Sequence, residues 1–469
     1  MKQIIINELK MLFRVRVLVY LTALFIITLI MVTWSGSAQT SQQQQQQQAA
    51  GEHVREQWES IDNMNPHSAA HYGSYVFKPV TSLSSIDEGI NSITGNVLRL
   101  EGHMQNEIIY SEASQTLSVS KFGKLKPSLL LQYIIPLLLI FLAFASVSSE
   151  KETGRLKLLV LQGASLRSVI FSKAISVWMY GLLLLAVTVA GQMIINSQGI
   201  GKDSLIRITL LSLVYSAYYY IITLLSTWFS ARLKTNTASL SSMLGLWLLW
   251  TIFLPRIWGN TTDKLYPLPS RQNFTAAMQE DRSQGLDGHN PSDKRSEEFK
   301  QQTLAKYKVT SLQDLPVNFD GLRMQADEEY GNAVWDKHFG NNYGLLQKQK
   351  KFYQLSGIIN PFASLQSTGM ALSGSDMHHH LDFLQQAENY RRTLIKTLND
   401  QHAFGGSKTG ERAQKENNQF YRSISQFEYK MPSWKLISIH YVTDFLLLAI
   451  WVLAITIIVF TTSKKIKLA

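Results

Sequence analysis

Six long apolar runs alternate with long polar stretches along the chain, at residues 12–34, 127–147, 175–195, 205–229, 240–254 and 437–460. Most of these runs approach or exceed the ~20 apolar residues that a helix needs to cross ~30 Å of hydrocarbon. The fifth run is shorter, and we expect it to end at Pro255. Core helices of soluble proteins more often stop at about 10–14 residues. The pattern therefore predicts an all-α membrane protein with six transmembrane helices.

The first run could instead be the apolar part of a cleaved signal peptide, because the small residues 35–38 follow it. Two features favour a retained span. A long amphipathic segment, residues 1–20, leads into the run, and the run is longer than the apolar region of a typical signal peptide.

Positive charge is concentrated beside the apolar runs. With the amino terminus in the cytoplasm, residues 1–16, 150–173, 232–234 and 464–467 fall on the cytoplasmic side, and together they hold 14 Lys and Arg against three Glu. This asymmetry predicts that both termini are cytoplasmic. It accounts for the formal charge of +11, so the basic composition points to membrane topology and to no nucleic-acid partner.

The topology leaves two long segments outside, which we expect to form two mainly helical periplasmic domains. The glutamine tract 42–48 either prolongs the first span as a helix or forms a loose tether, and the chain has no cysteine to staple either domain. The expected division is an amphipathic segment with the first span (1–35), a first periplasmic domain (36–126), spans two to five (127–254), a second periplasmic domain (255–433), and the sixth span with a basic tail (434–469).

The most informative stretch lies between the second and third runs, at about residues 150–166. Charged residues at the membrane edge, Glu150 and Glu152, precede Gly154, which we expect to end the helix. The leucines that follow form a helix too short to cross a bilayer, so it lies along the surface with apolar positions available to a partner. Ser165 is placed to cap the helix of the third span.

This stretch resembles the coupling-helix region of ABC-2 type transporter permeases, whose pattern is Glu-x-Gly-Thr-Leu, then Leu-Leu, then a Ser or Gln turn, a basic residue and a Lys. The residues on those positions are Glu152, Gly154, Leu156, Leu158, Leu159, Ser165, Arg167 and Lys173. Arg155 stands where the family has Thr, which puts the details of the partner contact in doubt. The two insertions also look like those of one branch of these permeases in Gram-negative bacteria, through the segments 65–73, 87–89, 315–321, Asp376 and 387–391.

The resemblance implies a permease subunit in the lipid bilayer of a bacterial inner membrane, paired with a second copy or a paralogue and with two ATP-binding subunits. The sequence holds no phosphate-binding Gly-x-x-x-x-Gly-Lys-Ser/Thr loop, so ATP and Mg²⁺ are expected on the separate ATPase and this chain is not expected to be an enzyme. Two functions stay open. One is export of a substrate. The other is mechanotransmission, in which the outer domains bind or release a periplasmic partner without transport.

Histidines and polar residues within spans supply the remaining candidates. His67 and His71 have metal-ligand spacing on a helix, with His103 and His378 as further candidates, but Pro66 and Gly73 make that helix uncertain and favour plain hydrogen bonding or exposure. Candidates to line a transport path are Ser212, Tyr215, Ser216 and Tyr219 on one helical face, and the acid Asp444. The alternative is that these polar residues pack against another span.

Overall fold

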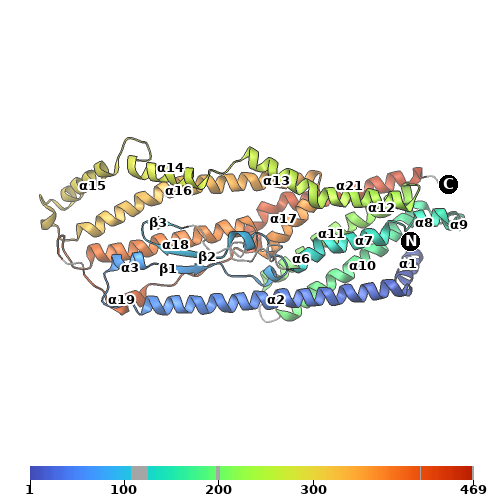
Figure 1. Cartoon of the computed structure of the whole chain (residues 1–469), viewed down its shortest axis with the longest axis horizontal. Coiled ribbons are helices and arrows are strands. Elements are labelled where there is room, and N and C mark those ends of the chain that lie inside the picture. The colour runs from blue at the N-terminus through green and yellow to red at the C-terminus, as the bar shows by residue number, and fades with distance from the viewer. Residues whose placement is uncertain (107–124, 197–200, 412–413, 467–469) are drawn as a thin grey trace.

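The computed structural model describes residues 1–106, 125–196, 201–411 and 414–466. Six helices in these ranges are long and apolar enough to cross a membrane, which confirms the six apolar runs: Arg16–Glu59, Pro127–Glu152, Leu166–Ile195, Lys202–Arg232, Asn236–Leu265 and Trp434–Thr462. The molecule is elongated, with these helices bundled at one end and the two insertions at the other (Figure 1). The N-terminus and the C-terminal part of the chain lie together at the bundle end, which we call the terminal end.

The six candidate spans comprise one or more helical segments each: α2 (Arg16–Glu59); α6 (Pro127–Leu129), η3 (Leu130–Ile134), α7 (Ile135–Ala143) and α8 (Ser148–Glu152); α10 (Leu166–Ile195); α11 (Lys202–Arg232); α12 (Asn236–Leu248), η5 (Leu249–Phe253) and α13 (Leu254–Leu265); α20 (Trp434–Ile437), η8 (Ser438–Tyr441) and α21 (Val442–Thr462). Short helices α1 (Lys2–Arg14), α9 (Arg155–Leu161) and η9 (Ser463–Lys465) lie at the terminal end. Helix α11 lies at the centre of the bundle, where it packs against α7, α10, α12, α17 (Pro361–Ser373) and α21.

The fifth span does not end at Pro255, as the sequence had led us to expect. It continues through the proline to Leu265. A π-helical turn, η5, comes directly before the proline, and the amide of Leu254 there bonds to the carbonyl of Leu249. This wider turn accommodates a residue that lacks an N–H and crowds the carbonyl four residues back. The second span repeats the arrangement, with η3 directly before Ile135–Pro136.

Helix α2 connects the two ends of the molecule without a break. Its 44 residues include the glutamine tract, so the tract extends the helix and does not form a loose tether. At 1.5 Å per residue the helix is about 66 Å long. It runs along one side of the molecule from the terminal end to the far end (Figure 1). There Trp58 is buried and its indole N–H donates to the carbonyl of Tyr421, 3.0 Å away.

The insertions contain these elements: α3 (Pro66–Tyr72), β1 (Ser74–Phe77), η1 (Ser82–Ser85), α4 (Asn91–Thr94), β2 (Val97–Glu101) and β3 (Met104–Gln105) from the first; α14 (Arg271–Gln284), α15 (Ser292–Tyr307), η6 (Leu312–Asp314), α16 (Phe319–Leu355), η7 (Ser356–Ile358), α17 (Pro361–Ser373), α18 (Met377–Phe404) and α19 (Asn418–Ser423) from the second. The second is helical, as expected. The first also carries a small antiparallel sheet in the order β1-β2-β3.

The two insertions pack into one unit, which we call the distal body. One apolar core joins Trp58 and Ala69 of the first insertion to Leu394 and Leu398 of the second. A second core joins the strand residues Val76, Leu98 and Leu100 to Phe383 and Ala387 of α18. The sequence-based division into two separate outer domains therefore misses that each insertion completes the core of the other. Part of the first insertion, residues 107–124, lies outside the described residues, as does Lys467 of the basic tail.

Helix α17 anchors the distal body in the bundle. Eleven of its 13 residues are buried, and it packs against α11 and α21. Its first turn is capped by Asn360, whose side-chain oxygen accepts from the amide of Phe362 and whose side-chain NH₂ donates to the carbonyl of Trp250 in the fifth span. We did not predict this helix from the sequence, because its few large apolar residues are scattered among small and polar ones.

We expect a Cβ atom at Gly321 to disrupt the contact between α16 and the end of α18. A Cβ built there would lie 2.5 Å from the backbone nitrogen of Ala403, so Gly321→Ala should lower the free energy of unfolding by about 1–3 kcal/mol. Gly340 is exposed on the same helix with open space around it, and Gly340→Ala should instead stabilise by about 0.5–1 kcal/mol. Thermal unfolding of the two purified variants measures both effects, and equal melting temperatures would contradict this packing.

Candidate functional site

The connection between the second and third spans has the local structure that its sequence predicts. Gly154 follows α8 in a left-handed conformation, with φ of 73°, which glycine adopts without strain. The short helix α9 then runs to Leu161, and Gly163 turns the chain back with φ of 91°. The hydroxyl of Ser165 accepts from the amide of Ser168 and caps α10.

Helix α9 has one leucine turned inward and two turned outward. The side chain of Leu156 is fully buried in the core of the bundle. Leu158 is 59% exposed and Leu161 83% exposed, while Leu159 is half-buried. Helix α9 lies at the terminal end of the molecule (Figure 1). One side of the helix packs against the bundle through Leu156, and the other side carries exposed apolar side chains.

A buried lysine fixes the base of this connection. Lys173, on α10, is 3% exposed, and its Nζ lies 2.5 Å from Oε1 of Glu8 and 2.9 Å from Oε1 of Glu150. The lysine thereby ties α1 and α8 to the third span. Glu8 was not predicted to take part, since nothing in the sequence relates it to a residue 165 positions away.

Two other residues of the motif also make contacts within the chain. Glu152 accepts a hydrogen bond of 3.1 Å from the side chain of Asn236, at the start of the fifth span. The guanidinium of Arg167 lies over the ring of Phe460, 3.4 Å from its centroid. Of the residues that the sequence assigned to ATPase coupling, Glu150, Glu152, Arg167 and Lys173 make contacts within the chain, Leu156 is buried, and Leu158 stays exposed.

The predicted path-lining face of α11 is mostly internal. Tyr215 and Tyr219 are fully buried, and Tyr219 donates to the carbonyl of Leu131 at 2.9 Å. The Ser212 hydroxyl bonds back to its own helix, and Ser216 is half-buried. Within one chain the two tyrosines are part of the buried core of the bundle.

Asp444 belongs to the junction between the bundle and the distal body. Its carboxylate is fully buried and accepts hydrogen bonds from Gln354, at 2.5 Å, and from Ser367, at 2.9 Å. Both donors come from the second insertion, so the acid joins the last span to that insertion.

Asp87 of the first insertion makes a similar link, which sequence reasoning missed. It accepts from the amide of Gln132 in the second span, 3.1 Å away, and the same amide also donates to the hydroxyl of Tyr215. Burial raises the pKa of the Asp87 carboxyl to about 6, against the opposing effect of the hydrogen bonds that it accepts.

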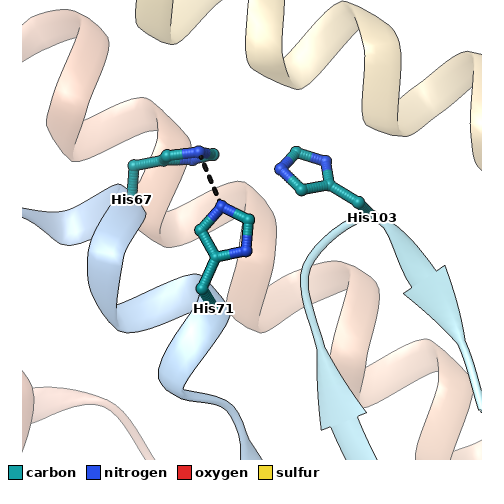
Figure 2. A group of neighbouring side chains, drawn as sticks. All are labelled: His67, His71 and His103. Carbon is teal, nitrogen blue, oxygen red and sulfur yellow. Dashed lines mark hydrogen bonds between the residues drawn. The ribbon is translucent and has the colours of Figure 1, made fainter.

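Three histidines gather in the distal body. His67 and His71 lie one turn apart on α3, and His103 reaches them from the turn between β2 and β3 (Figure 2). Their potential ligand atoms all lie within 4.8 Å of one another, and the Nε2 atoms of His67 and His71 are 3.1 Å apart. Pro66 and Gly73, which made this helix uncertain in the sequence, instead mark its two ends, because Pro66 takes the first turn and Gly73 the C-cap.

Partners from the second insertion orient this cluster. Nδ1 of His103 lies 2.8 Å from the carboxylate of Glu328, a residue of α16 that is 2% exposed. Burial alone would raise the pKa of Glu328, but the hydrogen bonds from His103 and the charge of Arg391 lower it below its ordinary value. Burial, together with repulsion from His71 and His103, lowers the pKa of His67 to about 4, so this imidazole is neutral at neutral pH.

His378 does not join the other three histidines. It lies at the start of α18, where its ring stacks on that of His440 with centroids 4.0 Å apart. The neighbouring Asp376 forms a separate buried group with His379 and Tyr441. The structure thus brings together His67, His71 and His103 from the candidate metal ligands and leaves His378 out.

Two family descriptions match parts of the chain, and each names a family of unknown function. Residues 271–430 match "Domain of unknown function (DUF3526)", and residues 103–255 match "Protein of unknown function (DUF2705)". The first range covers most of the second insertion, and the second covers the part of the chain from β3 to the middle of the fifth span. No curated protein and no solved structure matches the chain.

Replacing the buried lysine should release α1 from the bundle. Lys173→Met keeps most of the side-chain volume but leaves the carboxylates of Glu8 and Glu150 close together without their cation, and we expect a loss of about 2 kcal/mol or more in unfolding free energy. Limited proteolysis should then cut within residues 1–14, and the melting temperature should fall. Lys157→Met, at an exposed position of α9, is the matched control. If both variants resist proteolysis as the unchanged chain does, the ion pairs do not hold α1.

Proposed function

We propose that this chain is the membrane subunit of an ATP-driven transporter of the ABC-2 type, and that a separate ATPase binds to α9. The observation that carries the proposal is the division of α9 into two faces. Leu156 and the ion pairs of Lys173 fix the connection to the spans, while Leu158 and Leu161 stay exposed. A short helix held rigidly on one side and apolar on the other suits the transfer of movement from a docked partner.

The charge distribution supports a cytoplasmic location for α9. The terminal end of the molecule carries α1, α8, α9 and η9, and these contain eight of the 14 basic residues counted beside the spans. Cations of this kind favour the cytoplasmic side of a bacterial membrane. The distal body would then project into the periplasm.

ATP and Mg²⁺ are assigned to the partner ATPase, because the chain contains no phosphate-binding loop of its own. A second permease copy or a paralogue is also required by the resemblance. The first, fifth and sixth spans offer apolar surface for such a contact. In each of them, less than a quarter of the 18 most apolar consecutive residues is buried within the chain. Closure of two ATPase subunits would move the α9 of each permease, and the attached spans would tilt.

Mechanotransmission is the second candidate, and the continuity of α2 favours it. This helix packs against α10 in the bundle and contributes Trp58 to a core of the distal body. Because α10 begins directly after α9 and its connecting turn, a displacement of α9 has a short route to α2 and from there to the distal body. The burial of Tyr215 and Tyr219 removes two candidates for an export path within one chain.

A charge on the exposed face of α9 should prevent the ATPase from binding. We expect Leu161→Glu to reduce co-purification of the ATPase from native membranes about tenfold or more, because an apolar contact is replaced by a carboxylate that must be desolvated. Since Leu161 is 83% exposed, the chain itself should fold and insert normally. Leu268→Glu, at another exposed leucine in the distal body, serves as the control. Undiminished co-purification with Leu161→Glu would refute the docking role of α9.

A second experiment tests the topology, that is, on which side of the membrane α9 and α15 lie. Because the chain has no cysteine, Lys157→Cys and Lys294→Cys each give a single reactive thiol, one on α9 and one on α15. A membrane-impermeant thiol reagent added to spheroplasts should label position 294 and reach position 157 only after permeabilisation. Labelling of both positions from the same side would exclude the proposed arrangement.

Interrupting α2 should distinguish the two functions. Gln45→Pro places a proline at an exposed position in the glutamine tract, where it breaks the helix at a cost of about 3 kcal/mol, whereas Gln45→Ala keeps it intact. Spin labels on cysteines at positions 53 and 202 report the position of α2 relative to α11 with and without ATP. Mechanotransmission predicts an ATP-dependent distance change in the alanine variant that the proline variant loses, with ATPase binding unchanged. ATP-dependent movement of a substrate into vesicles that survives the proline would instead support export.

A further inference from the structure

We propose that His67, His71 and His103 bind a single zinc ion. The ion would join α3 to the β2–β3 turn within the first insertion, and Glu328 of the second insertion would support it through its contact with His103. The three ligand atoms converge within 4.8 Å of one another. A tetrahedral zinc with Zn–N distances of about 2.0–2.1 Å requires its ligand nitrogens to be about 3.3 Å apart, close to the 3.1 Å between the Nε2 atoms of His67 and His71. Small side-chain rotations of His103, whose ring centroid lies 4.9 Å from that of His71, complete the set.

The backbone is built to bring His103 to the other two rings. His103 has a positive φ of 65°, an uncommon conformation for a residue other than glycine. The amide of Gly102, directly before it, donates to the carbonyl of Ala70 on α3 at 2.9 Å. The turn between β2 and β3 is thus bonded to the helix that carries the other two histidines, and the positive φ directs the third imidazole toward them (Figure 2).

A carboxylate orients the third imidazole in the way that metal sites require. Glu328 accepts from Nδ1 of His103, so the proton of the neutral ring sits on Nδ1 and the other nitrogen is free to coordinate. That other nitrogen is the one turned toward His67 and His71 in Figure 2. Glu328 is itself held by Arg391, at 3.3 Å in the interior. Carboxylate–histidine–metal arrangements of this kind raise ligand basicity and fix ring orientation.

A hydrogen bond between His67 and His71 does not account for all of these contacts. Such a bond uses a single proton between two rings and leaves the position of His103 unexplained. A cation shared by the three imidazoles explains why three basic rings, with an acid directly behind one of them, converge at one point.

The ligand set and the surroundings favour zinc with one open position. Three imidazoles with no carboxylate in the first shell select a transition metal over Mg²⁺ or Ca²⁺, which prefer oxygen ligands. His103 also borders a cavity of about 790 Å³ whose walls include Met104, Met278, Arg282 and Trp335. Arg282, one of the residues that line this cavity, donates to the carbonyl of His103 at 3.0 Å. Three protein ligands leave the fourth position of a tetrahedral zinc to a water molecule.

The test uses the full chain purified without a polyhistidine tag, stripped with a chelator and dialysed against metal-free buffer. Titration with Zn²⁺ should give one tight site per chain, and Co²⁺ should give the visible absorption of a four-coordinate ion. His71→Ala and His103→Ala should each weaken Zn²⁺ binding about 100-fold or more, and Glu328→Gln about 10–100-fold. His289→Ala, at an exposed histidine outside the cluster, should bind as the unchanged chain does. Because His71 is exposed, its replacement should leave the apo protein folded.

Zinc should also raise the melting temperature of the unchanged chain and of His289→Ala, but not of His71→Ala, because an ion bound only by the folded state stabilises it. Equal Zn²⁺ affinity in the unchanged chain and in His71→Ala, or no binding at micromolar free Zn²⁺, would overturn the proposal. Both measurements are made on the isolated chain without an ATPase. Their outcome is therefore independent of whether α9 docks to a nucleotide-binding subunit.

Discussion

The buried carboxylate of Asp444 is the point at which the membrane spans and the distal body depend on each other. An acid inside an apolar helix is costly unless it is hydrogen-bonded, and here Oδ2 accepts from Gln354 and Ser367 of the second insertion, while Oδ1 is buried without a partner. Ser367 lies on α17, which is itself buried against α11 and α21. The Asp444 carboxylate of the last span therefore gains these two hydrogen bonds only when the distal body is folded against that span.

The same dependence appears on the other side of the bundle. Asp87 of the first insertion is satisfied by Gln132, a polar residue inside the second span, and Tyr215 of the fourth span shares that amide. A junction of this kind does not behave as a flexible linker, because separating the two parts would leave several buried polar groups without partners. Movements of the spans and of the distal body are consequently coupled.

The sequence predicted well those features that depend on local composition. Apolar runs of sufficient length gave all six candidate spans, and Gly154 and Ser165 correctly marked the start and end of the connection around α9. These features are legible because a membrane span needs about 20 apolar residues and a left-handed turn needs glycine, whatever the rest of the chain does. The prediction that the fifth span ends at Pro255 was wrong. A π-helical turn before Leu254 and Pro255 lets the helix continue through the proline, and no local sequence pattern predicts such a turn.

What the sequence left out depends on contacts between distant residues. Lys173 and Glu150 were assigned to a partner because they sit in a recognisable motif, yet the nearest groups to Lys173 include Glu8, which no pattern connects to it. The buried helix α17 is poor in large apolar residues, so hydrophobic periodicity does not reveal it. The convergence of His103 on His67 and His71 requires the fold of β2, β3 and α3, and the sequence offered His378 as a further candidate beside His103.

Because the chain has no cysteine, the stability of the distal body depends on its noncovalent contacts. A segment without disulfides must be stabilised by packing, by hydrogen bonds or by a metal, and the small sheet of the first insertion has little core of its own. Here Glu328, held by Arg391, lies behind the histidine cluster, so the network runs from α3 through the β2–β3 turn to α16 and α18. An ion at the cluster would tighten the same network that joins the two insertions. The stiffness of the distal body, and with it the movement that reaches its far end, would then depend on the occupancy of that site.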